Sequence, residues 1–313
     1  MAKSVLSDPW FHVEEAAFEY VEAQLWPNGP VCPHCGATAE QVGRVDRRSK
    51  PSRKNPEGVA VTGLRKCYAC RQTFTVRKGT IFEDSHLALH LWLQAIHLLC
   101  SSKKGHSTRQ LQRILGCGMK TAWHLGHRIR EMMAPAANSG PLGGAGKTVE
   151  ADETELARSR KTRRPEGFRR RTHNPKVLSL VERGGNIRSV TLDHRGVGAR
   201  LRRMADKDSR LVTDMGQAFK FQGFAAHETV DHHKFEWARG DVHTNTLEGF
   251  FSVFKRGMIG VYQHVDTKHL DRYLAEFDFR QNTRARLGID DVRRTAIAVK
   301  GAAGKRLTYV TPD

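Results

Sequence analysis

Two Cys-x-x-Cys pairs constrain the fold of this chain more than any other feature of its sequence. Cys32 and Cys35 form the first pair, and Cys67 and Cys70 form the second. Each pair can supply two thiolates from one tight turn, and four thiolates complete the tetrahedral shell that Zn²⁺ prefers. The gap between the pairs exceeds the usual spacing, and we attribute the excess to a basic loop at the ribbon tip. The pairs predict a structural zinc site, since neither adjoins the βαβ pattern typical of thiol redox proteins.

The chain is also strongly basic. It contains 52 Lys and Arg against 33 Asp and Glu, a formal net charge of +19. Such an excess attracts polyanions and makes their binding depend on salt. A charge that only keeps the protein soluble is the alternative. Most of the excess is concentrated in the stretches 44–66 and 158–171, which favours nucleic acid as the partner.

Residues 83–134 have a helical pattern that contains a candidate helix-turn-helix. Leu111, Ile114 and Leu115 make one apolar face, and a turn follows at 116–118. A second helix then offers polar side chains to a DNA major groove. The candidate contacts on it are Lys120, Thr121, His124 and Arg128. A plain helical hairpin would show the same pattern, and the neighbouring ribbon and the net charge favour DNA binding.

From residue 148 onward, strand and helix patterns alternate in the order β-β-β-α-β-α-β-α. This order predicts an RNase H-like fold, a mixed α/β sheet with flanking helices, in which the first and fourth strands are neighbours. The expected domains are an N-terminal helix and zinc ribbon (1–82), a helix-turn-helix domain (83–134), a linker (135–147), the α/β domain (148–290) and a C-terminal tail (291–313).

Three acidic residues stand out in the α/β region. Asp152 and Asp214 are expected where short strands end, and Glu248 opens an amphipathic helix. Lys255 follows Glu248 by seven residues, two turns along the same helical face. Clustered carboxylates repel one another unless cations lie between them. Two Mg²⁺ ions held by Asp152, Asp214 and Glu248 could clamp the attacking and leaving oxygens of a phosphodiester. Each acid alone is weak evidence, because other carboxylates are equally available by composition.

Four segments together resemble a known family. HTNTLEGFFSVFKRGMIGVYQHV and LDRYLAEFDFRQNTR are similar to the catalytic signature of bacterial zinc-ribbon insertion-sequence transposases of the DDE superfamily. VEADETEL and RLVTDMGQAF resemble that family's first and second Asp segments. The resemblance covers nearly the whole chain in order. Members differ in whether Asn or Glu is the third catalytic residue, and this chain has both, as Asn245 and Glu248. We favour Glu248 because a carboxylate neutralises Mg²⁺ better than an amide does, and Asn245 remains a candidate ligand or helix cap.

The resemblance implies a DNA transposase. Such an enzyme binds terminal inverted repeats and target DNA, then cleaves and transfers strands with two Mg²⁺ or Mn²⁺ ions. Lys255 is expected to contact phosphate near the scissile bond, and the basic insert to grip phosphates nonspecifically through Arg163, Arg164, Arg169 and Arg170. Pairing two DNA ends implies at least a homodimer in the DNA complex. A catalytically silent, domesticated DNA-binding regulator and a nuclease or resolvase without strand transfer are the alternatives.

The expected location is the bacterial cytoplasm, in association with the nucleoid. The sequence has no apolar run long enough to cross a bilayer. Its six cysteines occur without an export signal, which favours a reducing compartment.

Overall fold

The computed structural model describes residues 4–53, 55–136, 139–156, 174–192, 196–214 and 223–308. The chain divides into two compact units. Unit one comprises Met1–Ser102, Thr108–Met133 and Ile289–Asp313, and unit two comprises Lys103–Ser107 and Ala134–Gly288. The insert arginines 163, 164, 169 and 170 lie outside the described residues. No helix among the described residues has the length and apolar character needed to cross a membrane.

Unit one begins with a helix and a small ribbon. Helix α1 spans Glu14–Leu25, and three short strands form an antiparallel sheet in the order β1-β2-β3. Strand β1 spans Val42–Arg44, β2 spans Arg65–Cys67 and β3 spans Thr73–Phe74. Single 3-10 turns lie at Val5–Ser7, Pro9–Phe11 and Ala39–Gln41. The apolar cluster of the ribbon is small and includes Cys32, Val42, Cys67 and Phe74, so a bound metal would add stability that packing does not supply.

Four helices build the rest of unit one: α2 (Leu89–Ser101), α3 (Thr108–Leu115), α4 (Met119–Met133) and α8 (Asp291–Lys300). The last of these lies where the sequence led us to expect only a tail. Helix α8 packs against α1, α2 and α4, and Thr295 Oγ1 lies 3.0 Å from His97 Nδ1 of α2. Its buried face includes Arg294 and Thr295 beside Ala298 and Val299, so it carries no apolar stripe by which a sequence pattern could reveal it.

Unit two contains a five-stranded mixed sheet in the order β6-β5-β4-β7-β8. The strands span Thr148–Glu155 (β4), Lys176–Glu182 (β5), Ile187–Thr191 (β6), Arg210–Asp214 (β7) and Ala226–Val230 (β8). Pairing is antiparallel between β4, β5 and β6 and parallel between β4, β7 and β8. The first and fourth strands of this unit, β4 and β7, are therefore neighbours, which confirms the RNase H-like arrangement that the sequence predicts.

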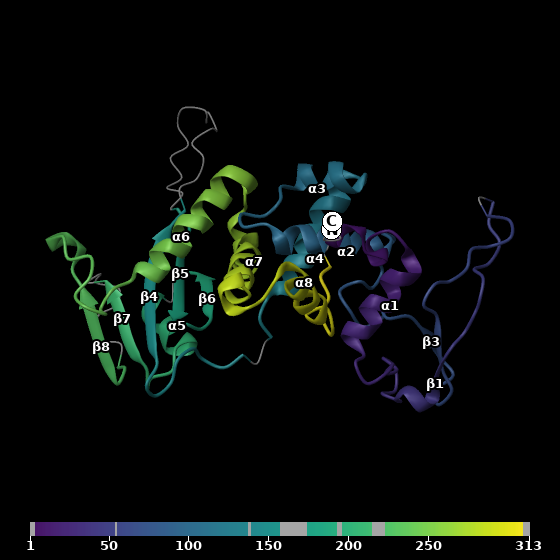
Figure 1. The fold of residues 1–313 in the computed structure, drawn as a ribbon, viewed down its shortest axis with the longest axis horizontal. Helices are drawn as coiled ribbons and strands as arrows, with labels where there is room; N and C mark the ends of the chain where they lie inside the picture. Colours follow the sequence, from purple (N-terminus) through teal and green to yellow (C-terminus); the bar gives the residue numbers. More distant parts are fainter. Residues whose placement is uncertain are drawn as a thin grey trace, which may run out of the picture. The chain divides into compact units, whose positions relative to one another are not determined.

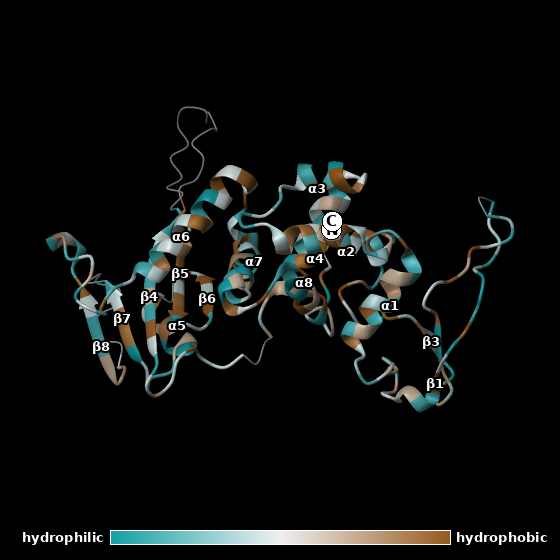
Figure 2. Cartoon of the chain, viewed as in Figure 1, coloured by the Kyte–Doolittle hydropathy of each residue, from teal (hydrophilic) through white to brown (hydrophobic). Residues whose placement is uncertain are grey.

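Helices cover both faces of this sheet (Figure 1). On one face lie α6 (Asn245–Gly257), a π-helical turn (Met258–Tyr262) and α7 (Leu270–Asn282), which share a core with alternate residues of β5. On the other face lies α5 (Gly196–Met204), packed against Val149 and Ala151 of β4. The β5 strand lies between the two cores and is largely brown in Figure 2. Short 3-10 turns follow at His232–Lys234, Thr267–His269 and Ala285–Leu287.

Candidate functional site

The four cysteines of the ribbon meet at one point. Cys32 Sγ lies 3.7 Å from Cys70 Sγ, and Cys35 Sγ lies 3.6 Å from Cys67 Sγ. All four sulfurs lie within 4.8 Å of one another. Tetrahedral zinc with bonds of about 2.3 Å separates its sulfur ligands by roughly 3.8 Å, so the residues present fit that ion. The backbone N–H of Cys70 lowers the pKa of Cys67 to about 7, whereas the pKa values of Cys35 and Cys70 are raised.

Two acids come to neighbouring positions because β4 and β7 are parallel. The register pairs Ala151 with Thr213, and the next residue on each strand is an acid, Asp152 on β4 and Asp214 on β7. Residues in register on adjacent parallel strands face the same side of a sheet. Strand β4 continues to Glu155 along β5, so Asp152 lies inside the strand, where pairing with β7 stops, instead of at the strand end that the sequence suggested.

A third carboxylate, Glu150, anchors helix α6 to the same strand. Glu150 lies two residues before Asp152 and is fully buried. It accepts hydrogen bonds from Thr246 N (3.1 Å) and Thr246 Oγ1 (3.0 Å) in the first turn of α6. Arg183 Nε donates to it at 2.8 Å. A carboxylate at a helix N-terminus satisfies free N–H groups and favours the helix dipole. Glu150 therefore fixes the end of α6 that carries Glu248.

The negative charges of Asp214 and Glu248 affect the pKa of Asp152. Burial, followed by the negative charge of Asp214 and with a smaller effect of Glu248, raises the pKa of Asp152 to about 7. The N–H of Glu153 donates to Asp152 Oδ1 at 2.7 Å and opposes the shift. Among the described residues, the carboxylates of Asp152, Asp214 and Glu248 do not form a group of potential metal ligands as close together as the four cysteine sulfurs. Mutual repulsion of this kind is the condition that a cation relieves.

The remaining residues of the acidic region lie on or beside α6. Asn245 is the first residue of the helix and is exposed, while the N-cap position belongs to Thr244. Lys255 lies in the last turn of α6 and is partly buried. His232 follows β8 and places its Nε2 3.8 Å from Glu248 Oε1. No motif in the sequence marks Glu150 or His232 as part of the site. The one sequence signal for Glu150 is the period-two alternation of β4, which puts it on the same face of the sheet as Asp152.

The predicted recognition helix, α4, follows a turn in which Gly116 has φ 62°. Leu111 and Leu115 of α3 are buried, but Ile114 is 48% exposed, so it is not part of the buried face. Lys120 and Thr121 are exposed, His124 is partly exposed, and Arg128 is buried.

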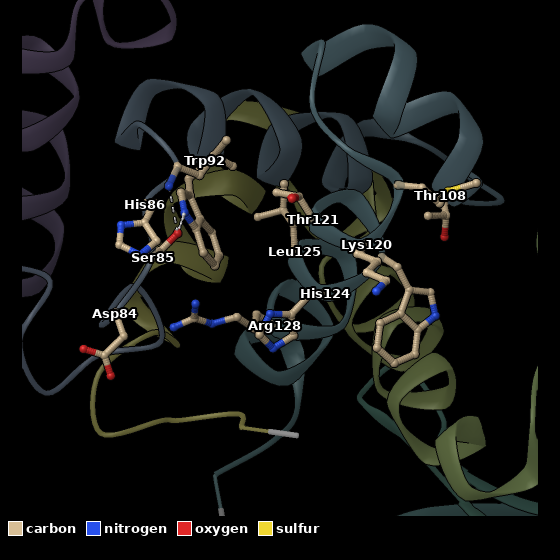
Figure 3. A pocket seen from close by; sticks show the side chains of 13 residues that line it. Asp84, Ser85, His86, Trp92, Thr108, Lys120, Thr121, His124, Leu125 and Arg128 are labelled. Atoms are coloured by element: carbon tan, nitrogen blue, oxygen red, sulfur yellow. Dashed lines mark hydrogen bonds between the residues drawn. The ribbon is translucent and has the colours of Figure 1, made fainter. Parts of the chain in front are cut away.

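These four residues of α4 are among those that line a cavity of about 850 Å³, which Figure 3 shows from close by. The guanidinium of Arg128 lies over the Trp92 ring at 5.2 Å and donates to Glu83 O. In this conformation Arg128 is held inside the unit, whereas Lys120 and Thr121 can reach a ligand.

Two family models match the chain. Residues 141–282 match the ISXO2-like transposase domain, and residues 13–73 match the transposase zinc-ribbon domain. The first range holds the sheet and the helices that carry the acids. The second holds all four cysteines.

Two individual proteins are also similar. An uncharacterised protein in the transposable element ISH50 of Halobacterium salinarum is 28% identical over 292 residues, which cover 87% of this chain and 92% of the relative. The crystal structure of the Mos1 strand transfer complex shares 12% identity, over 67% of this chain and 74% of that chain, with a TM-score of 0.24.

Proposed function

Because this chain belongs to the insertion-sequence transposases that combine a zinc ribbon with an ISXO2-like transposase domain, we propose that it cuts and joins DNA at the acidic site of unit two. The observation that carries the proposal is the register that sets Asp152 beside Asp214. We take Glu248 as the third acid, since it lies in the first turn of α6, whose N-terminus is fixed on β4 by Glu150.

Asp152, Asp214 and Glu248 would hold divalent cations, Mg²⁺ or Mn²⁺. Two such ions, when bound, supply the Lewis acidity that activates the attacking oxygen and stabilises the leaving oxygen of a phosphodiester. The chain itself orients the ligands, since Glu150 fixes the N-terminus of α6 on β4. Lys255, two turns after Glu248, would contact a phosphate of the bound strand. Asn245 stays the alternative third ligand.

DNA recognition would fall to unit one and to the basic insert. We assign the terminal inverted repeats to the zinc ribbon and to Lys120, Thr121 and His124 of α4. Arg163, Arg164, Arg169 and Arg170 would add contacts to phosphates that are independent of sequence. The net charge of +19 supports a polyanionic partner. Bringing two element ends together requires at least two copies of the chain in the DNA complex.

The test uses a labelled duplex that carries one inverted repeat from the DNA flanking the gene. We expect Mg²⁺-dependent nicking at the repeat end and, with target DNA added, joined products. Asp152→Asn should bind the duplex as wild type does and lose at least a thousandfold in cleavage. Asp208→Asn changes an exposed carboxylate outside the site and should cleave normally. Unimpaired cleavage by Asp152→Asn would refute the assignment.

The same assay separates the alternatives. Binding without nicking by the wild-type chain would identify a silent DNA-binding regulator. Nicked products without joined ones would identify a nuclease or resolvase.

A further inference from the structure

The segment 231–244 connects the two acid-bearing parts of unit two. It begins directly after β8, whose last residue, Val230, pairs with Asp214. It ends at Thr244, directly before α6 begins at Asn245. Within the segment, His232 Nε2 lies 3.8 Å from Glu248 Oε1. The segment is therefore tied to the acidic site both through the chain and through a side-chain contact.

Two large aromatic side chains of this segment are exposed. Phe235 is 81% exposed and Trp237 is 57% exposed. Exposing an aromatic ring to water raises the free energy of the folded chain, and folding normally buries such rings in a core. The Trp237 ring packs against the His232 ring, with centroids 5.0 Å apart and an angle of 35° between planes. The contact holds the indole beside the residue that approaches Glu248.

The backbone of this segment forms a turn that is stabilised by main-chain hydrogen bonds. Asp231 O accepts hydrogen bonds from Lys234 N (3.0 Å) and Glu236 N (3.1 Å), and His232 O accepts one from Phe235 N (3.2 Å). Phe235 has φ 60°, in the left-handed region that side chains with a Cβ rarely adopt. The strained backbone of this turn holds the Phe235 side chain in water, where it does not contribute to a core. Strain of this kind is more common at ligand-binding sites than in segments that only pack.

Charge in the segment is nearly balanced. Lys234 lies 3.6 Å from Asp231, and Arg239 lies 3.6 Å from Glu236. Each cation is thus partly offset by an acid three residues earlier in the chain. Attraction of a ligand at this place therefore depends on the ring faces more than on ion pairing.

We propose that Phe235 and Trp237 form a stacking platform for unpaired nucleobases at a cleaved DNA end. The inference rests on the proposed function, which brings DNA to the adjacent acids. Inside a duplex both faces of each base are covered by its neighbours, whereas an unpaired base at the end of a cut strand has an uncovered face. Every base has a π-face, so exposed aromatic rings bind unpaired bases without regard to sequence. The platform gives the site a means of holding the end between cleavage and joining.

The experiment measures affinity of the zinc-loaded protein for two DNA probes in buffer without Mg²⁺ or Mn²⁺, where no cleavage occurs. One probe is a blunt inverted-repeat duplex, and the other carries two unpaired terminal nucleotides, one of them fluorescent 2-aminopurine. We expect wild type to quench the 2-aminopurine through stacking. Trp237→Ala should weaken binding of the overhang probe about 5- to 150-fold and abolish quenching. Its affinity for the blunt probe should stay unchanged.

Two further variants guard against misfolding. Phe235→Gly removes the ring and suits a φ of 60°, so it should fold and still lose affinity for the overhang. Trp237→Phe keeps an aromatic face and should retain most of the binding. Ile259→Ala, which removes another exposed apolar side chain of unit two (64% exposed), is the matched control and should bind both probes as wild type does.

The outcomes separate the platform from the proposed function. If Trp237→Ala and Phe235→Gly bind and quench the overhang probe as wild type does, the platform is overturned, and nicking by the same proteins shows that the transposase proposal stands. If wild type neither binds the repeat nor nicks it with Mg²⁺, both proposals are overturned together.

Discussion

Glu150 accepts hydrogen bonds from both the N–H and the hydroxyl of Thr246, across 96 residues of chain. This pairing joins the central strand of the sheet to the helix that carries Glu248. Thr244, at the N-cap, makes no side-chain capping bond, so a carboxylate from β4 takes over that role. The geometry of the acidic site thus depends on a residue that need not touch a substrate.

Replacing Glu150 should therefore reduce both stability and activity. Glu150→Ala leaves Arg183 without its buried partner, and loss of one member of such a pair costs about 3–5 kcal/mol. Glu150→Gln keeps an acceptor for Thr246 and should cost less, about 1–3 kcal/mol. Urea unfolding and DNA nicking are the two measurements. Glu155→Gln, an exposed carboxylate on the same strand, is the control. Equal stability of Glu150→Ala and wild type would contradict the anchoring role.

Zinc should be bound at one ion per chain through the four cysteines. Cys67→Ser removes one of the four sulfurs and should lower the zinc content measured by native mass spectrometry. Cys117 lies outside the cluster, and Cys117→Ser should keep its zinc. Chelation should also remove binding to the inverted repeat, because the small ribbon core cannot hold its fold alone. Full zinc retention by Cys67→Ser would exclude this site.

Asp278 should make unit two less stable as pH rises from about 4 to 7. Burial raises its pKa to about 7, against the lowering effect of hydrogen bonds donated by Ser189 N and Oγ. The folded chain keeps this proton up to about pH 7, whereas the unfolded chain releases it near pH 4. Across that window the unfolded state binds fewer protons, so the free energy of unfolding falls with rising pH.

The change should amount to several kcal/mol, since one pKa unit corresponds to about 1.4 kcal/mol. Urea titrations between pH 4 and 8 measure it. Asp278→Asn cannot ionise and should reduce the slope, while the part due to Asp152, whose pKa is also raised to about 7, remains. A slope equal to that of wild type would assign the effect to other groups.

Two cations of α4 should behave in opposite ways. Lys120 is exposed, and Lys120→Ala should weaken DNA binding about equally across sequences and reduce the salt slope by about one. Arg128 packs over Trp92 and donates to Glu83 O, so Arg128→Ala should lower the melting temperature of the protein. Salt-dependent anisotropy and thermal unfolding distinguish the effects. A lower melting temperature for Lys120→Ala, with unchanged DNA binding, would reverse the assignment of roles.

The sequence by itself determined the zinc site and the first five elements of unit two, β-β-β-α-β. The predicted order was wrong after that point, since among the described residues β7 is followed by a second strand, β8, and helices α6 and α7 follow with no strand between them. Four cysteines in two tight pairs leave few arrangements other than a shared metal, and the alternation of strand and helix patterns depends on short-range periodicity. Both are local properties that a chain displays before it folds. The sequence pattern did not predict helix α8, because two polar residues, Arg294 and Thr295, make up much of its buried face.

The tertiary structure alone decided which acids meet and what holds them. The pairing of Ala151 with Thr213 and the bond from Thr246 to Glu150 join positions far apart in the chain. Glu150 is one of many acidic residues by composition, yet it is fully buried and hydrogen-bonded. Register between distant strands depends on the packing of both sheet faces at once, and no local pattern in the sequence contains that information.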